Sequence, residues 1–212
     1  MLNPATTSTS ILAISGSLRS TSSNKTLLQA AAALAPDNVK IAFYESIANL
    51  PHFNPDIDTE NPPSAVIDFR NHFQQADAVL ICTPEYAHGV PGALKNALDW
   101  IVGSGELMHK PVALINPSMT SFHAQESLAE TLTVMMAKVH AVRIPLTSTK
   151  IGVNDILANA DISSALKEVI LHLVNKVLLR KTSHLPLPPI GRCCKMSLVF
   201  GGVPKRLKGR VC

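Results

Sequence analysis

Residues 10–24 read SILAISGSLRSTSSN, and this stretch sets the interpretation of the whole chain. Its apolar start predicts a short buried strand over 10–15. From 15 to 24 the chain carries five serines, one threonine, one arginine and one asparagine around a single glycine. The run NKTLLQAAAALA from residue 24 predicts a helix, and the serines before it are suitable N-caps. A strand, a polar loop and a helix therefore follow one another directly.

The same alternation of strand and helix repeats along the chain. Strands are predicted at 10–15, 40–44, 77–83, 111–117 and 141–146, and helices at 24–35, at 64–75, from 93 onward, at 122–140 and at 161–181. Such alternation predicts an α/β fold with right-handed crossovers and a parallel sheet covered on both faces. Five strands fit the order 2-1-3-4-5, which predicts a flavodoxin-like three-layer sandwich.

In sheets of this kind, ligands bind beyond the carboxyl ends of the strands, where the strand order reverses. That point lies between the first and third predicted strands. The loops that follow these two strands are SGSLRSTSSN at 15–24 and TPEYAHGVPG at 83–92. We therefore expect the two loops to form one site.

The first loop has the features of a phosphate site. Helix N–H groups favour an anion, hydroxyl and amide groups add donors, and a guanidinium binds phosphate in a fork. The candidate side chains are Ser17, Arg19, Ser22 and Asn24. A polar turn with an N-cap is the alternative. The patterns GxxxxGK[ST] and GxGxxG are both missing, which argues against an ATPase and a standard dinucleotide-binding fold.

The second loop suits a flat ring. Pro84 and Pro91 stiffen its ends, Gly89 and Gly92 allow close backbone approach, and Tyr86 offers a ring for stacking. The alternative is a proline-rich turn with a structural tyrosine. The loop alone does not decide between them.

Composition predicts one domain with an appendage. The chain has 212 residues, 46% hydrophobic and 16% charged, which is typical of a globular protein. Six of its 19 bases lie beyond Lys181, which leaves 13 bases against 15 acids and a body charge of −2. We predict a domain over 1–181 and a basic tail rich in proline and glycine over 182–212.

Several classes of partner are not expected. Cysteine and histidine spacings do not suggest zinc or another metal, and Cys82 is expected to be a small buried residue. The apolar runs are too short to cross a membrane, and no export signal is apparent, so a cytoplasmic location is expected. The body charge predicts no nucleic-acid binding by the fold.

Together, GSLRSTSSN and TPEYAHGVPGALKNALDW resemble the NADPH-dependent FMN reductase family, which includes quinone, chromate and azo reductases. The resemblance runs from about Ile11 to Leu179. It assigns the FMN phosphate to Ser17, Arg19, Ser22 and Asn24. It assigns the isoalloxazine ring to Pro84, Glu85, Tyr86, Ala87, His88 and Gly89, and a further flavin contact to Ser118. Many members have Asn where this chain has Ala87, which removes a side-chain contact and leaves the backbone contacts.

The resemblance implies an FMN-dependent oxidoreductase that passes electrons from NADPH or NADH to a small acceptor. Quinones, azo compounds, metal oxyanions and free flavin are all candidate acceptors. The chemistry takes place at the flavin N5 and requires no catalytic side chain. His88 and His123 could donate protons to a reduced quinone, but we expect them to be ordinary surface or core residues. A homodimer or homotetramer is implied, with Lys95, Asp99 and Trp100 as packing or subunit contacts.

Two other functions remain open for the same fold. One is a flavodoxin-like electron carrier, although such carriers are usually strongly acidic and the body of this chain is not. The other is a regulatory protein that keeps the fold without FMN.

Overall fold

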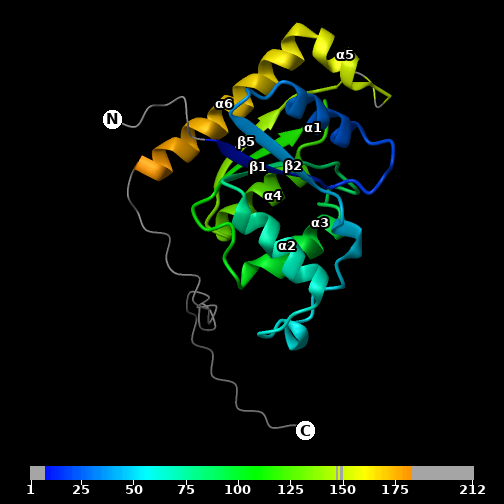
Figure 1. Ribbon diagram of the computed structural model, residues 1–212. Helices are drawn as coiled ribbons and strands as arrows, with labels where there is room; N and C mark the ends of the chain where they lie inside the picture. Colours follow the sequence, from blue (N-terminus) through cyan, green and yellow to red (C-terminus); the bar gives the residue numbers. More distant parts are fainter. Residues whose placement is uncertain (1–7, 147, 149, 183–212) are drawn as a thin grey trace, which may run out of the picture.

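The computed structural model describes residues 8–146, 148 and 150–182 (Figure 1). Its elements form a central sheet with helices packed against it. The last helix includes Thr182, one residue past the predicted domain boundary. The rest of the predicted tail lies outside the described residues.

The sheet has five parallel strands in the order β2-β1-β3-β4-β5, which confirms the predicted order. The strands are β1 (Thr9–Ser15), β2 (Val39–Tyr44), β3 (Ala78–Cys82), β4 (Pro111–Asn116) and β5 (Lys138–Arg143). All residues of β3 and β4 are buried, as their continuous apolar sequences require. The order reverses between β1 and β3, so the loops after these strands emerge side by side.

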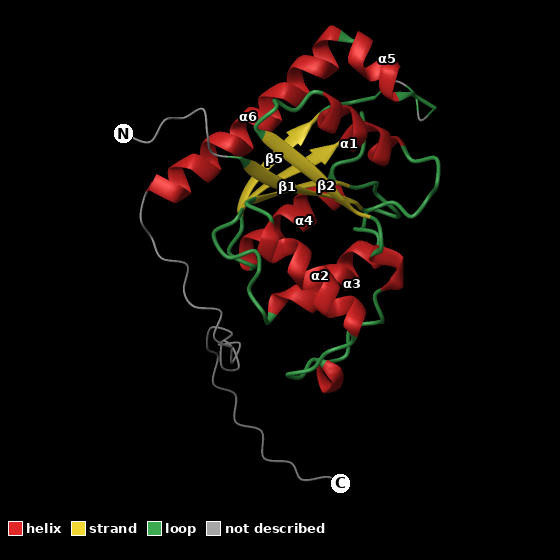
Figure 2. Cartoon of the chain, viewed as in Figure 1, coloured by secondary structure: helices red, strands yellow, loops and turns green. Residues whose placement is uncertain are grey.

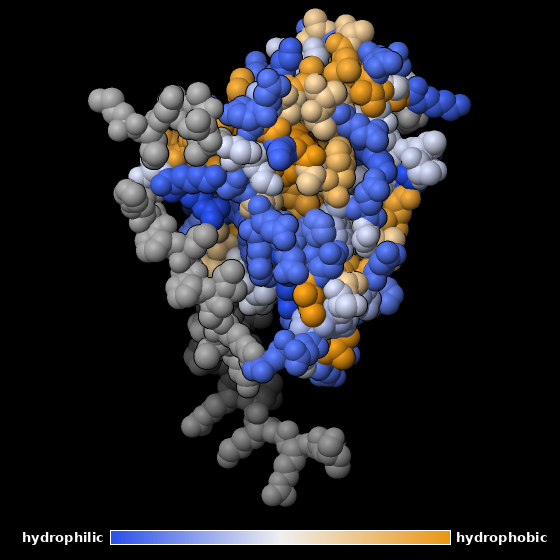
Figure 3. Space-filling model, viewed as in Figure 1, coloured by the Kyte–Doolittle hydropathy of each residue, from blue (hydrophilic) through white to orange (hydrophobic). Residues whose placement is uncertain are grey.

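Helices cover both faces of the sheet, which confirms the three layers (Figure 2). One face carries α1 (Ser23–Ala33), α5 (Val153–Ala158) and α6 (Ala160–Thr182). The other carries α2 (Ser64–Gln75), α3 (Gly92–Val102) and α4 (His123–Val134). Each face of the sheet has its own apolar core, and successive residues of each strand point alternately into one core and the other. On the surface, apolar and polar side chains are interspersed over the face seen in Figure 3.

The prediction around the fifth strand was wrong. The helix predicted over 122–140 ends at Val134, and β5 starts three residues before the predicted 141–146. Met136 has a φ of 63°, and its N–H donates to the Thr133 carbonyl while that of Ala137 donates to Leu132. This Schellman ending normally carries glycine at the left-handed position, and here methionine occupies it. The short α5 was also not predicted.

The segment 45–63 contains two short 3₁₀ turns, η1 (Ile47–Asn49) and η2 (Pro55–Ile57), and packs onto α3 through η1 and through Pro51 and Phe53. Trp100 is fully buried, and its indole N–H donates to the Pro51 carbonyl at 2.8 Å. Lys95 pairs with Asp99 one turn along the same helix. Of the two roles predicted for these residues, Trp100 therefore has the packing role.

Candidate functional site

The two predicted loops meet at the carboxyl ends of β1 and β3. Ser15 and Cys82 are in register at the strand ends, and the Gly16 N–H donates to the Cys82 carbonyl at 2.9 Å. A Cβ on Gly16 would lie 2.2 Å from Thr83 Oγ1. Only glycine therefore lets the first loop approach the second this closely.

Hydroxyl-to-backbone hydrogen bonds shape the first loop. The Ser17 N–H donates to Ser15 Oγ at 3.2 Å, and the Arg19 N–H donates to Ser17 Oγ at 3.3 Å. Ser22 is the N-cap of α1, but its hydroxyl makes no capping bond. The hydroxyls of Ser15 and Ser17 thus stabilise the loop, whereas the Ser22 hydroxyl does not accept a hydrogen bond from the first backbone N–H groups of α1.

Asn24 faces the sheet. Its Oδ1 accepts from Cys82 Sγ at 3.3 Å, and its Nδ2 donates to Ser22 Oγ at 3.5 Å. Burial raises the pKa of Cys82, so its thiol stays protonated. The predicted burial of Cys82 is confirmed. Asn24 therefore joins the start of α1 to the end of β3 and orients Ser22.

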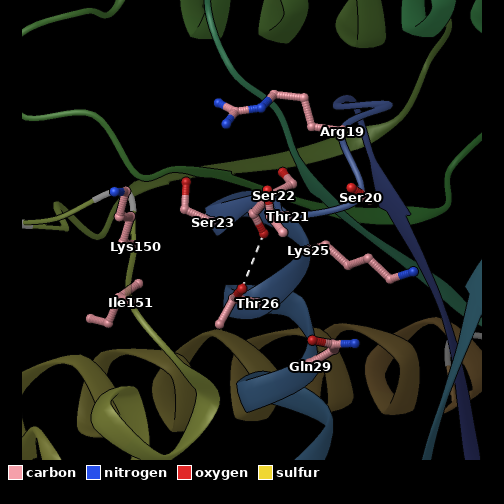
Figure 4. A pocket seen from close by; sticks show the side chains of 10 residues that line it. All are labelled: Arg19, Ser20, Thr21, Ser22, Ser23, Lys25, Thr26, Gln29, Lys150 and Ile151. Carbon is pink, nitrogen blue, oxygen red and sulfur yellow. Dashed lines mark hydrogen bonds between the residues drawn. The ribbon is translucent and has the colours of Figure 1, made fainter.

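A cavity of about 620 Å³ opens beside the first loop (Figure 4). It is lined by Arg19, Ser20, Thr21, Ser22, Ser23, Lys25, Thr26, Gln29, Lys150 and Ile151. Of the four predicted phosphate residues, Arg19 and Ser22 line it, whereas Ser17 and Asn24 do not. The described lining contains hydroxyls and cations and no carboxylate.

The cations of this cavity differ in their partners. Lys25 Nζ lies 2.6 Å from Glu45 Oε1, so its charge is already paired. Within the described residues, the side chains of Arg19 and Lys150 have no hydrogen bond or ion pair. Two unpaired cations beside hydroxyl donors, at the start of a helix, favour a phosphate-bearing ligand.

A second cavity of about 390 Å³ lies between the two loops and the start of α3. It is lined by Gly16, Leu18, Arg19, Tyr86, Pro91, Gly92 and Ala93. Arg19 lines both cavities, so they adjoin at this residue. Tyr86 is one of these lining residues and is 53% exposed. A polar and a more apolar cavity thus lie next to each other.

A tight turn holds Tyr86. Its N–H donates to the Gly89 carbonyl at 3.1 Å, and the Gly89 N–H donates back at 2.9 Å. Ala87 and His88 between them have φ values of 49° and 60°. Residues with side chains are uncommon in this left-handed region, and such conformations cluster at ligand sites. Ala87, His88 and Gly89 line neither of the two cavities described above.

Two contacts tie the second loop to α4. Glu85 Oε2 accepts from the Ala124 N–H at 2.8 Å, where the helix dipole favours a carboxylate. The ring of His88 stacks on that of His123 at 4.1 Å, and His123 also stacks on Phe122 at 4.5 Å. Glu85 and His88 therefore hold the loop in place rather than face the cavities.

Ser118 and Pro84 also lie outside the two cavities. The Ser118 hydroxyl accepts from the N–H groups of Thr120 and Ser121, at 3.2 and 2.9 Å, and so folds the loop after β4. The Pro84 carbonyl accepts from Thr83 Oγ1 at 3.2 Å. Both residues shape the loops at this edge of the sheet.

Sequence reasoning missed part of the lining. Lys150 and Ile151 come from the connection between β5 and α5, and Leu18 and Ala93 flank the second cavity. The rule that ligands sit beyond the carboxyl ends of parallel strands points to the β5 connection as well. In the described residues, no cluster of three or more metal-binding side chains occurs, and none of the helices is long and apolar enough to cross a membrane.

The chain is similar to several characterised flavin enzymes. Residues 9–151 match the NADPH-dependent FMN reductase family. An NAD(P)H-dependent FMN reductase of Pseudomonas aeruginosa is 39% identical over 140 residues, which cover 64% of this chain and 74% of the relative. A quinone reductase of Pseudomonas putida is 40% identical over 114 residues, which cover 51% of this chain and 60% of the relative.

A solved structure extends the similarity over more of the chain. The flavoenzyme NAD(P)H:(acceptor) oxidoreductase FerB of Paracoccus denitrificans superposes with a TM-score of 0.66 and 25% identity. The match covers 81% of this chain and 98% of that one. It agrees with the flavodoxin-like fold.

Proposed function

Since the chain belongs to the NADPH-dependent FMN reductase family, we propose that it is an FMN-dependent NAD(P)H oxidoreductase that reduces a small quinone-type acceptor. The observation that carries the proposal is the pair of cavities that share Arg19. One is lined by hydroxyls and cations, and the other by Tyr86 and backbone at glycine and proline. An elongated ligand with a phosphate at one end and a flat ring at the other fits this arrangement.

The residues present fit FMN. Arg19 is available because its guanidinium has no partner among the described residues, and Ser22 lines the same cavity with a hydroxyl that caps nothing. We assign the FMN phosphate to these two side chains and to the N-terminus of α1. Ser17 and Asn24 support the assignment by folding the loop and by orienting Ser22.

The ring end of the ligand belongs to the second cavity. FMN, when bound, supplies two-electron transfer between NAD(P)H and the acceptor. The turn at Tyr86–Gly89 holds Tyr86, which lines this cavity, and Glu85 fixes the turn to α4. These residues bind and orient the ring, and no side chain takes part in proton transfer.

A flat conjugated acceptor suits the open side of the site. Tyr86 is 53% exposed and Phe122 is 42% exposed. His123 stacks on Phe122 and on His88, which follows Tyr86 by two residues. Exposed rings offer stacking surface to a quinone. Azo compounds, metal oxyanions and free flavin are further candidate acceptors. A homodimer or homotetramer in the cytoplasm remains a prediction.

The test is an absorbance spectrum of the purified protein, after FMN is added and the excess removed. We expect a bound flavin spectrum that bleaches on anaerobic addition of NADPH and returns on addition of a quinone. A protein that stays colourless after FMN is added would contradict FMN binding and support the FMN-free regulatory alternative. Bound flavin that NADPH does not bleach would support an electron carrier instead.

A further inference from the structure

The phosphate cavity extends well beyond what one phosphate needs. Its volume of about 620 Å³ lies within the range of cavities that hold whole drug-sized ligands, roughly 300–1,000 Å³. It reaches from Arg19 at the first loop, along α1 to Gln29, and across to Lys150 and Ile151. The FMN phosphate proposed above takes up only the end near Arg19 and Ser22.

The free charges lie on one side of this cavity. In Figure 4 the Lys150 side chain lies on the same side of α1 as the Ser23 hydroxyl, and the Lys25 ammonium points to the opposite side. Lys25 is neutralised there by Glu45. Lys150, by contrast, has no partner among the described residues. A second anionic group is therefore favoured at the Lys150 side of the cavity.

We propose that Lys150 binds the 2′-phosphate of NADPH and makes the enzyme prefer NADPH over NADH. This inference rests on the proposed function and deepens it by naming the residue that selects the nucleotide. FMN has a single phosphate, for which Arg19 and Ser22 are already at hand. NADPH differs from NADH by one phosphate on the adenosine ribose, which an unpaired ammonium beside a hydroxyl recognises.

The rest of the lining suits the adenosine end of the nucleotide. Ile151 adds apolar surface next to Lys150, while Thr26 and Gln29 add a hydroxyl and an amide along α1. Thr26 Oγ1 donates to the Ser22 carbonyl at 3.1 Å and still has a lone pair free to accept. Small-molecule sites combine such apolar surface with a few polar groups.

The kinetic test compares the two nucleotides in Lys150→Ala. We expect kcat/KM for NADPH to fall about tenfold, since a charge-assisted contact is lost. Activity with NADH and the affinity for FMN should change less than twofold. Lys150→Arg should retain the preference, and Lys40→Ala, an exposed lysine of β2 outside both cavities, serves as the charge-matched control. An unchanged NADPH-to-NADH ratio in Lys150→Ala would overturn the proposal.

A weaker FMN affinity with an unchanged ratio would also overturn it, because Lys150 would then bind the FMN phosphate. A binding test separates the inference from the proposed activity. The FMN-loaded protein is titrated calorimetrically with 2′-AMP and with 5′-AMP, and we expect 2′-AMP to bind more tightly and to lose that advantage in Lys150→Ala. Equal affinities for both probes in the unaltered protein would contradict the inference, whereas absent NAD(P)H oxidation would contradict the proposed function alone.

Discussion

Cations at the two ends of the sheet differ in their burial and in their partners. At the carboxyl end, Arg19 and Lys150 lie exposed beside a cavity and have no partner among the described residues. At the amino end, Lys110 stands just before β4 and is only 5% exposed. Its ammonium donates to the carbonyls of Phe73 and Ala76, the latter at 2.7 Å, and so closes the end of α2.

A second buried group near the amino end follows the same rule. Arg70 donates to the Trp100 carbonyl and to Asp58 Oδ1 at 2.8 Å, and its Nε lies 3.9 Å from Glu106. Burial raises the pKa of Glu106, while a hydrogen bond from Ser104 and the charge of Arg70 oppose that rise. Arg70 therefore has its partners inside the protein. Glu106 accepts from the Ser104 hydroxyl through Oε2, whereas its buried Oε1 has no hydrogen-bond partner among the described residues.

This comparison distinguishes buried cations that stabilise the fold from exposed cations that are available to bind a ligand. A buried ammonium with two carbonyl partners contributes to stability, because those carbonyls need a donor. An exposed guanidinium without a partner contributes little to stability, and its charge remains available for binding. Substitutions at the amino end should therefore change unfolding, and those at the carboxyl end should change ligand affinity.

The largest effect is expected from Lys110→Met. The change keeps an unbranched side chain but removes both hydrogen bonds at the end of α2. We expect a loss of about 3 kcal/mol in the free energy of unfolding, measured by urea denaturation. FMN affinity of the folded protein should not change. A stability equal to that of the unaltered protein would show that the buried ammonium serves no structural purpose.

The next effect is expected from Gly16→Ala. The new Cβ would lie 2.2 Å from Thr83 Oγ1 and 2.7 Å from Thr83 Cβ, so the two loops must move apart. We expect a loss of about 2 kcal/mol in stability together with weaker FMN binding. The matched control is Gly103→Ala, whose Cβ would come no closer than 3.9 Å to Asp58. Equal behaviour of the two variants in denaturation and FMN titration would contradict the close approach of the loops.

A smaller effect concerns pH. Burial lowers the pKa of Lys110 from 10.5 to about 8, with help from Arg180 and against the charges of Asp77 and Glu106. Between pH 8 and 10.5 the unfolded chain therefore binds more protons at Lys110 than the folded protein does. The contribution of Lys110 to the free energy of unfolding rises with pH over that window. From pH 7 to 9 the stability difference between the unaltered protein and Lys110→Met should grow by about 1 kcal/mol.

Urea denaturation of both proteins at pH 7, 8 and 9 measures that difference, in which the titration of other groups cancels. A difference that stays constant or shrinks as the pH rises would contradict the burial of a charged ammonium at this position.

The smallest effect is expected from Lys25→Gln. Lys25 lines the phosphate cavity, but its ammonium pairs with Glu45 at the surface. Exposed pairs of this kind contribute about 0.5 kcal/mol or less. We expect thermal unfolding to stay nearly the same and FMN affinity to change less than twofold. A tenfold loss of FMN affinity would show that Lys25 leaves Glu45 to bind the phosphate.

Much of the fold follows from local sequence. Continuous apolar runs predicted β3 and β4, and the alternation of strands and helices predicted the order of the sheet. The end of α4 could not be predicted, because a methionine rather than a glycine occupies the left-handed position at residue 136. Nothing in the local sequence marks that ending.

The site was predictable only in part, for a related reason. Polar composition and position predicted the loop that carries Arg19 and Ser22. The inward direction of Asn24 and the tie between Glu85 and α4 depend on contacts between residues far apart in sequence. The strand-end rule points to the connection after β5, but the contact of Lys150 with the α1 cavity depends on the packing of α5 against α1, which one sequence does not reveal.

The most direct test of the account is the FMN affinity of Arg19→Ala, measured by quenching of flavin fluorescence in titrations of the apoprotein. Arg19 belongs to both cavities, and its side chain makes no hydrogen bond or ion pair with the described residues. We predict FMN binding weaker by a factor of about 10 to 100, since charge-assisted hydrogen bonds contribute roughly 1.5–3 kcal/mol. Thermal unfolding of the apoprotein should be unchanged, and Lys40→Ala should bind FMN normally. An unchanged FMN affinity in Arg19→Ala would contradict the assignment of this site to FMN.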